Sequence, residues 1–206
     1  MSDRDDGPVS ATATTEARLR AVTIGALSPL TGPIELADYD PAWPSWFEDE
    51  ATRIRAALGD RVLRLEQVGS TAVPGLAAKP IIDILLVVAD SSEERAYVPP
   101  LESAGYVLRI REPDLDEHRM FKRPDRDLNL HVLSAGCPEI DRMVAFRDRL
   151  RTHEADRALY ERTKRELAAR RWTYAQEYAD AKSEIIESIL LSAAQVPPAQ
   201  PGRGSG

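Results

Sequence analysis

One aspartate interrupts an otherwise apolar segment, and it constrains the fold of this 206-residue chain more than any other feature. Residues 80–88 read Pro-Ile-Ile-Asp-Ile-Leu-Leu-Val-Val. Such a run is typical of a central strand that is covered on both faces. Aspartate is disfavoured in strands and is rarely buried without a partner. Asp83 therefore indicates a metal or an ion-pair partner beside it, and the alternative is a structural salt bridge with Lys79 or an arginine at the strand end.

The remaining pattern predicts an α+β domain. Strands are expected at residues 34–36, 62–68, 80–88, 106–111, 118–122 and 128–133. Helices are expected at residues 44–58, around Pro99-Pro100 up to Gly105, and at 139–152, 155–171 and 173–192. This order predicts a mixed sheet with helices packed on it and a C-terminal helical layer.

The two ends differ from the middle in composition. Of the 26 glycines and prolines, 12 lie in residues 1–33 and 196–206. These segments are expected to be disordered tails around one domain of residues 34–195. Charges in the tails cancel, so the net charge of -7 belongs to the domain. This charge argues against nonspecific binding of duplex nucleic acid, while small anionic ligands stay open.

Composition also restricts the compartment and the partners. The single cysteine, Cys137, cannot form an internal disulfide. No segment has the apolar length of a membrane span, and the N-terminus is acidic where a secretory signal would be basic. We expect a cytoplasmic protein without a membrane partner. Nucleic acid is the least supported partner, because aromatic residues amount to 6% and no basic stripe interleaves with them.

A turn with small and hydroxyl side chains precedes the Asp83 strand. Gly69, Ser70 and Thr71 follow a predicted strand, where backbone N–H groups and hydroxyls can converge on phosphate oxygens. Taken alone, Gly-Ser-Thr is a common turn or helix start. Ser70 lies 13 residues before Asp83, with Lys79 between them. The combination predicts a phosphate-binding turn next to the carboxylate.

The strand over residues 128–133 carries polar side chains in its middle. Alternation places Asp127, Asn129 and His131 on one face. Beside Asp83, His131 could act as a metal ligand, a proton acceptor or a hydrogen-bond partner. The alternative is a structurally satisfied histidine. His118 and His153 are expected at the surface or at helix ends.

Basic residues cluster at the hairpin that leads into this strand: Arg119, Lys122, Arg123 and Arg126. In a regular strand Arg119 and Arg123 share one face and Lys122 lies on the other, so only one set can neutralise a bound phosphate. The alternative is a solvated hairpin of mixed charge. Two further pairs are expected to be internal braces or exposed ion pairs: Arg147 with Asp148, and Tyr178 with Lys182.

Several blocks of this sequence resemble the GrpB family. They are Tyr39–Pro44, Val68–Ile84, Leu130–Val132, Phe146–Asp148, Tyr160 with Lys164, and Tyr178–Ser183. The resemblance implies the nucleotidyltransferase superfamily fold. Its hallmarks are a Gly-Ser turn, an Asp-x-Asp strand and a third carboxylate on a later strand.

This resemblance implies roles for particular residues. Gly69 and Ser70 match the turn that holds a nucleoside triphosphate, and Asp83 matches the first carboxylate ligand of Mg²⁺. The second carboxylate position is Leu85, and the third is His131 or Asn129. One carboxylate and a histidine are a poor substitute for three carboxylates around Mg²⁺. Three other groups could complete a one-metal site: Glu66, Asp127 or the phosphates of the nucleotide.

The leading hypothesis is an enzyme that transfers a nucleotidyl group from ATP or another nucleoside triphosphate to a small acceptor. An adenylate formed on a carboxylate could also feed ligation to an amine. His131 would be the base or a metal ligand, and Lys79, Arg119 and Lys122 would neutralise phosphates. Leu85 favours an alternative, a catalytically reduced nucleotide- or anion-binding module that acts as a sensor or scaffold. A structural interaction domain would require Asp83 and His131 to pair internally.

Overall fold

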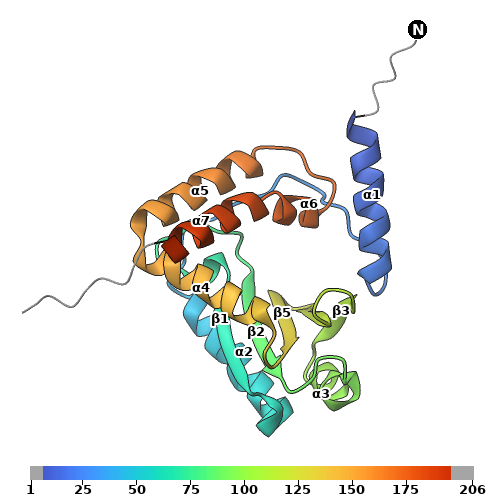
Figure 1. The fold of residues 1–206 in the computed structure, drawn as a ribbon. Coiled ribbons are helices and arrows are strands. Elements are labelled where there is room, and N and C mark those ends of the chain that lie inside the picture. The colour runs from blue at the N-terminus through green and yellow to red at the C-terminus, as the bar shows by residue number, and fades with distance from the viewer. Residues whose placement is uncertain (1–6, 196–206) are drawn as a thin grey trace, which may run out of the picture.

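The computed structural model describes residues 7–195 and shows a five-stranded mixed sheet (Figure 1). The strands are β1 (Arg64–Val68), β2 (Ile82–Val88), β3 (Val107–Glu112), β4 (His118–Arg123) and β5 (Arg126–Ser134). Their spatial order is β1-β2-β5-β4-β3. The central pair β2 and β5 is parallel, and the other neighbours are antiparallel. The predicted mixed sheet is confirmed.

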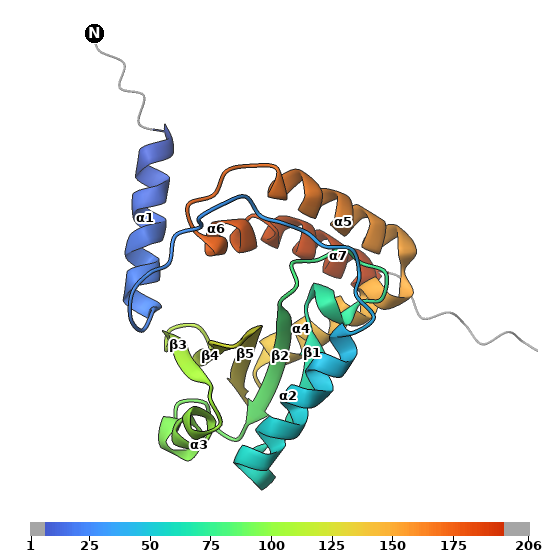
Figure 2. The same cartoon turned by 180° about the vertical axis from the view of Figure 1, so that it is seen from behind.

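Helices cover both faces of the sheet (Figures 1 and 2). They are α1 (Gly7–Val22), α2 (Trp43–Leu58), α3 (Val98–Ser103), α4 (Pro138–Thr152), α5 (Glu154–Ala168), α6 (Ala175–Asp180) and α7 (Ser183–Gln195). Helices α2 and α3 lie on one face, and α4 to α7 form a layer on the other, as Figure 2 shows. The expected C-terminal helical layer is therefore present.

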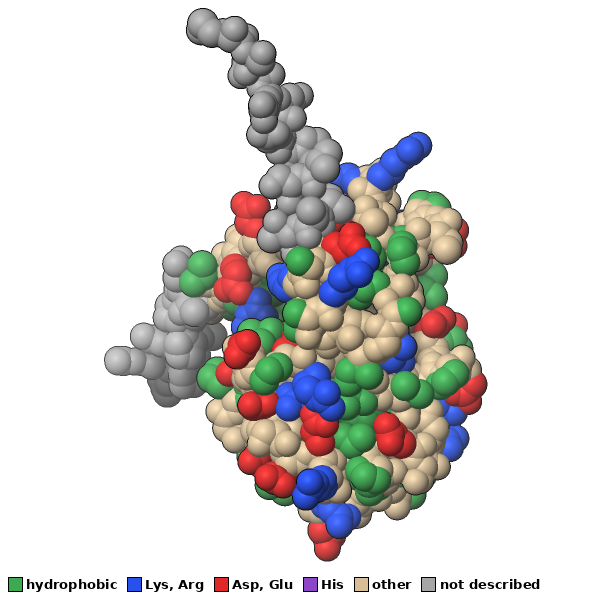
Figure 3. Space-filling model, turned by 90° about the vertical axis from the view of Figure 1, so that its right-hand side faces the viewer, with side chains coloured by type: hydrophobic (Ala, Val, Ile, Leu, Met, Phe, Trp, Pro, Cys, Tyr) green, Lys and Arg blue, Asp and Glu red, His purple; other side chains and the backbone are tan. Residues whose placement is uncertain are grey.

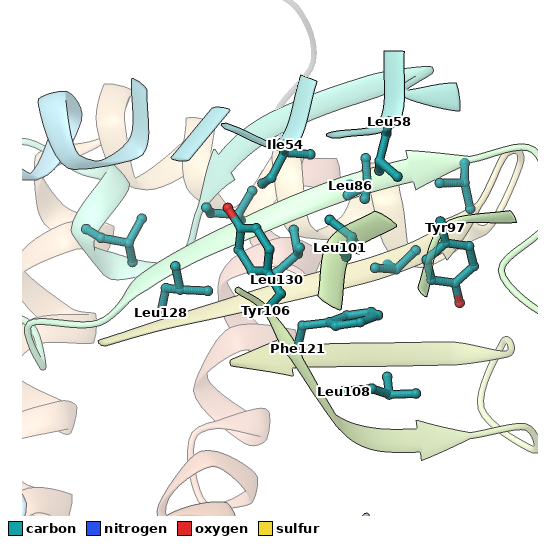
Figure 4. Packing of buried hydrophobic residues seen from close by; sticks show 14 of the residues in the cluster. Ile54, Leu58, Leu86, Tyr97, Leu101, Tyr106, Leu108, Phe121, Leu128 and Leu130 are labelled. Carbon is teal, nitrogen blue, oxygen red and sulfur yellow. The ribbon is translucent and has the colours of Figure 1, made fainter. Parts of the chain in front are cut away.

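The main core lies between the sheet and the α2–α3 side (Figure 4). Alternate residues of the inner strands point into it, among them Leu86 of β2, Leu130 of β5 and Phe121 of β4. Ile54 and Leu58 of α2 cover them. Gly59 then ends the helix with φ of 55°, a backbone conformation that suits glycine, so the predicted stop is confirmed.

The opposite face of the sheet is divided into an apolar and a polar part. Leu85, Val87 and Leu133 pack against Ile140 of α4. Nearer the start of β2, this face carries polar side chains. Asp83 lies there, opposite Asn129 in the β2–β5 register. The apolar part anchors α4, and the polar part is left facing the C-terminal helices.

The N-terminal segment differs from the prediction of a disordered tail over residues 1–33. Residues 7–22 form α1, and Thr23 bridges to Ile110 on the edge strand β3. Leu19 of α1 is buried. In Figure 2, α1 stands beside the rest of the molecule near β3. The predicted tail at 196–206 lies outside the described residues.

Two further predictions were wrong. Residues 34–36 do not form a strand, and Ala37 alone makes an isolated bridge to Ala78. The helix predicted over residues 173–192 is broken at Ala181 and Lys182, which lie in a turn between α6 and α7. The apolar stripe across this segment continues through the break, so helical periodicity alone could not reveal it.

One face of the molecule carries charges of both signs. On the face shown in Figure 3, acidic and basic side chains are interspersed and form no single-sign patch. Among the helices of residues 7–195, none combines the length and the apolar character that crossing a bilayer requires.

Candidate functional site

Asp83 and Asn129 form the centre of a polar cluster on the α5–α7 side of the sheet. Asn129 Nδ2 donates to Asp83 Oδ1 over 2.6 Å, and Lys122 Nζ donates to Asn129 Oδ1. A lysine only donates and a carboxylate only accepts, so both partners fix the same orientation of the amide. Burial raises the pKa of Asp83, but contacts with His131 and Asn129 and the charge of Lys182 outweigh it and hold the pKa below its usual value.

The absence of a side chain at Gly69 leaves space for the Asp83 carboxylate. The φ of 69° and ψ of -170° at Gly69 lie in a region that is essentially limited to glycine. A Cβ at this position would lie 2.4 Å from Asp83 Oδ2. The glycine of the predicted turn therefore allows the carboxylate to approach the backbone, and Ser70 follows directly.

Two histidines extend the cluster across the sheet. His131 Nε2 lies 3.7 Å from Asp83 Oδ1, and its side chain is 17% exposed. Its Nδ1 lies 3.0 Å from His118 Nε2. The other nitrogen of His118 lies 2.7 Å from Glu112. The expectation that His118 is an unremarkable surface residue was wrong, because it contacts His131.

All lysines of the chain gather at this site. The sequence has four lysines and 23 arginines, and the lysines are Lys79, Lys122, Lys164 and Lys182. Burial lowers the pKa of Lys79, Lys122 and Lys182, and the charge of Asp83 opposes that effect in each. Lys164 in turn is repelled by Lys182. We call these four residues the lysine cluster.

Lys164 connects the lysine cluster to the predicted phosphate turn. Its ammonium donates to Ser70 Oγ over 3.1 Å and to the carbonyl oxygen of Ala77, and it lies 4.9 Å from the centre of the Tyr160 ring. Only 2% of the residue is exposed. Burial, followed by repulsion from Lys182, lowers the pKa of Lys164 to about 7.

Lys182 repeats this arrangement from the turn between α6 and α7. Its ammonium lies 4.7 Å from the centre of the Tyr178 ring, four residues earlier in the chain. Tyr160 and Lys164 have the same spacing and the same contact. The pair was expected to be a brace or a surface ion pair, whereas the charge of Asp83 acts on its lysine and raises the pKa of Lys182 against the effect of burial.

Other predicted binding residues are not brought to this site. Thr71 is buried and donates its hydroxyl to the Ile81 carbonyl oxygen over 3.1 Å, which ties the turn to β2. Arg119 points to the opposite face of β4 and pairs with Glu94 at 2.6 Å and Glu117 at 2.9 Å. The period-two alternation separates it from Lys122.

The remaining hairpin arginines also bind carboxylates elsewhere. Arg123 pairs with the buried Glu50 at 2.8 Å. Arg126 lies over Trp46, 6.0 Å from the centre of one ring, and 3.5 Å from Asp49. Of the four predicted basic residues, Lys122 is the one that reaches Asp83.

The donor set does not fit the two-metal site that the resemblance implies. Asn129 turns its N–H group toward Asp83 over 2.6 Å and so offers no oxygen ligand on that side of the carboxylate. Leu85, at the second carboxylate position, is buried in the apolar cluster under α4. Within residues 7–195, no three His, Cys, Asp or Glu side chains are grouped so as to hold a metal ion. Asp83 therefore has lysines, an amide and an imidazole around it.

Neither candidate for a replacement carboxylate changes this result. Glu66 pairs with Arg147 of α4 at 2.7 Å and with Arg64 at 3.1 Å. Asp127 is exposed and acts on Lys79 and Lys122 through its charge.

A separate cavity of about 290 Å³ lies beside β1. Its lining includes Tyr39, Pro44, Gln67, Arg147 and Arg151. The first and fourth of the family-like blocks therefore meet here, away from the side chains that contact Asp83. Arg147 braces β1 through Glu66 and the backbone, as predicted for an internal ion pair.

A compositional signal could have indicated that Lys164 and Lys182, which the sequence analysis named without a role in binding, belong to the site. A chain that uses arginine for 23 of its 27 basic residues has lysine at only four positions. Two of them lie four residues after a tyrosine, at Lys164 and Lys182. Lysine is a compact cation whose pKa shifts on burial, unlike arginine, so this choice marks positions with a special environment.

The fold and this cluster define an α+β protein that gathers ammonium groups, an imidazole and one carboxylate under a C-terminal helical layer. Residues 33–191 match the family described as GrpB protein. The chain belongs to the GrpB family.

Three similar proteins illustrate the relationship. A UPF0157 protein of Halalkalibacterium halodurans is 56% identical over 184 residues, which cover 89% of this chain and 94% of that protein. The crystal structure of the conserved protein GrpB from Enterococcus faecalis has a TM-score of 0.62 and 31% identity, covering 76% of this chain and 99% of that one. A dephospho-CoA kinase of Mycolicibacterium paratuberculosis is 32% identical over 164 residues, which cover 67% of this chain and 40% of that protein.

Proposed function

We propose that this protein binds the phosphates of a nucleoside triphosphate in the lysine cluster and transfers the nucleotidyl group to a small acceptor. The single observation that carries the proposal is the placement of the four lysines: Lys122 bonds Asn129 beside Asp83, Lys164 bonds Ser70, and Lys79 and Lys182 lie within range of the Asp83 charge. One of these lysines, Lys164, is buried and the other three are partly buried, so placing them together costs free energy through desolvation and mutual repulsion. A polyanion would offset that repulsion.

The turn at Gly69 and Ser70 supports the phosphate assignment. Lys164 holds Ser70 from the helical layer, while Lys122 holds Asn129 from the sheet. Groups on both sides of the cluster are thus positioned before a ligand arrives. Ammonium groups bind phosphate oxygens with charge-assisted hydrogen bonds. The resemblance to the nucleotidyltransferase superfamily, which we retain as part of this proposal, leads to the same assignment.

His131 is the proton acceptor in the proposed reaction. A hydroxyl of the acceptor gives its proton to His131 Nε2, its oxygen bonds to the α-phosphorus, and pyrophosphate leaves. Asp83 Oδ1 lies 3.7 Å from Nε2 and competes for the single proton of that hydroxyl, so a second N–H or O–H of the acceptor substrate would be needed to bind both groups at once. The lysines offset the charge that develops on the phosphates. Because the donor set does not fit two Mg²⁺ ions, this scheme assigns no step to a protein-bound metal.

The test is pyrophosphate release from ATP over a panel of hydroxyl, amine and carboxylate acceptors, with and without Mg²⁺. His131→Asn and Asp83→Asn should each lower turnover by about 100-fold or more. His153→Asn is the matched control, because His153 is exposed at the end of α4. Unchanged turnover in Asp83→Asn would sink the assignment.

A second candidate is a nucleotide- or anion-binding module without turnover. The direct bond between Asn129 and Asp83 favours it, because the amide N–H offers no oxygen ligand to a catalytic metal on that side of the carboxylate. Calorimetry with ATP separates the two candidates. Tight binding that EDTA leaves unchanged, with no pyrophosphate released, supports the module. The match to the relative named dephospho-CoA kinase covers 40% of that protein, so its name favours neither candidate.

A further inference from the structure

A chain of hydrogen bonds crosses three neighbouring strands on the polar face of the sheet. Glu112 ends β3, His118 begins β4, and His131 lies within β5. Glu112 and His118 are opposite each other in the β3–β4 register. The two imidazole rings stack, with centroids 5.3 Å apart and planes inclined by 21°. Strand register therefore places Glu112 opposite His118, while His131 is opposite Met120, two residues along β4 from His118.

The partners decide which ring nitrogens carry protons. A carboxylate only accepts, so His118 Nδ1, 2.7 Å from Glu112, carries a proton. Burial lowers the pKa of His118 more than Glu112 and Glu139 raise it, which favours a neutral ring whose Nε2 accepts. His131 Nδ1, 3.0 Å away, must then donate. A neutral His131 is left with no proton on Nε2.

A protonated His131 turns an N–H toward Asp83 and lowers the pKa of that carboxyl, whereas in the neutral ring the bare Nε2 faces another acceptor. His131 Nε2 and Asp83 Oδ1 are 3.7 Å apart, which is too far for a direct hydrogen bond. Two acceptors that face the same space bind a donor between them. The lysine ammonium groups act on the Asp83 side and disfavour a metal cation there. A hydroxyl or amine N–H of a substrate supplies the missing donor.

We propose that Glu112 and His118 are positioning residues that hold His131 with its proton on Nδ1, so that Nε2 receives the proton of the acceptor substrate. This inference rests on the proposed transfer reaction. As the substrate O–H bond breaks, a bond from His131 Nε2 to hydrogen forms. His131 then carries the positive charge, and its Nδ1 proton stays in the hydrogen bond to His118 Nε2, because burial keeps the His118 ring neutral.

Nitrogen NMR of protein labelled with ¹⁵N in its histidines tests the tautomer directly. The chain has three histidines, so His118→Gln and His131→Asn assign the signals and the exposed His153 serves as reference. We expect neutral His131 to show a protonated Nδ1 and a bare Nε2. In Glu112→Gln this preference should weaken, because an amide can also donate to His118. A proton on Nε2 of His131 in the unmodified protein overturns the inference.

Kinetics provide the second measurement. Glu112→Gln should lower kcat by about tenfold or more, with little change in KM for the nucleotide. Glu139→Gln is the matched control, since it removes the same charge near His118 without a hydrogen bond to the ring. Equal turnover in Glu112→Gln and Glu139→Gln overturns the positioning role. No turnover in the unmodified protein overturns the transfer reaction itself, whereas the NMR result judges the tautomer separately.

Discussion

The carboxylate of Asp83 packs against the α-carbon of Gly69, and any β-carbon there would lie 2.4 Å from Oδ2. Val68, the last residue of β1, is opposite Asp83 in the sheet. The turn that starts at Gly69 therefore begins next to the Asp83 carboxylate. This contact joins the two most distinctive segments of the sequence, the Gly-Ser turn and the Asp83 strand.

Gly69→Ala should displace the Asp83 carboxylate and weaken binding of inorganic triphosphate. The backbone conformation alone costs about 1–3 kcal/mol of stability. Gly75→Ala is the matched control, because Gly75 also has a positive φ of 76° but nothing lies within 4 Å of its Cβ position. Both variants should lose stability in urea titrations, and Gly69→Ala alone should lose triphosphate affinity. Equal affinities would show that Asp83 does not organise the site.

Lys182→Met should lower the affinity for inorganic triphosphate by about 10- to 100-fold, because a charged hydrogen bond contributes about 1.5–3 kcal/mol. Arg162→Met removes the same charge from an exposed position on α5 and should change affinity far less. Calorimetry at two salt concentrations measures both. An equal loss in the two variants would mean that net charge matters and the lysine cluster does not.

Lys164 should make stability depend on pH above neutrality. Its pKa is about 7 in the folded protein and near the ordinary lysine value of 10.5 when the chain is unfolded. The unfolded chain therefore binds more protons between these values, so its contribution to the free energy of unfolding rises with pH. Urea denaturation between pH 7 and 9 should show a smaller rise in the free energy of unfolding for Lys164→Met than for the unmodified protein. An unchanged slope would contradict the burial of a charged Lys164.

Glu94 should stabilise the protein against acid. Hydrogen bonds from Arg111 lower the pKa of Glu94. Burial raises this pKa, but the hydrogen bond from Arg119 also lowers it, and the result is about 2. Its stabilisation, roughly 3 kcal/mol, is present above pH 4.5 and lost as pH falls toward 2. Glu94→Gln should remove it at pH 7, whereas Glu93→Gln, at an exposed neighbour, should not. If the two variants unfold alike between pH 2 and 7, Arg119 is not held by Glu94.

Local pattern predicted the sheet and one side of the site. Alternation along β5 places Asn129 and His131 on one face, and the structure confirms it. The apolar run around Asp83 became an interior strand. Both predictions depend only on residues that are close in the sequence, where side chains of a strand alternate between the two faces of the sheet.

Tertiary contacts determined what the sequence analysis left out. The link from His118 to His131 needs the β4–β5 register, which contains an irregularity. Lys164 and Lys182 reach the site from α5 and the α6–α7 turn, and the tyrosine four residues before each marks a shared environment without showing that it adjoins Asp83. The turn at Lys182 interrupts residues with good helix propensity, so packing overrides local preference there.

The placement of the four lysines has a practical consequence for handling the protein. Every side-chain amine in the sequence belongs to the lysine cluster. Amine-directed dyes, crosslinkers and coupling to sensor surfaces would therefore attach to the chain terminus or to the site itself, and a folded, labelled sample could fail to bind anions. The single thiol, Cys137 at the start of α4, is partly accessible and offers an attachment point elsewhere.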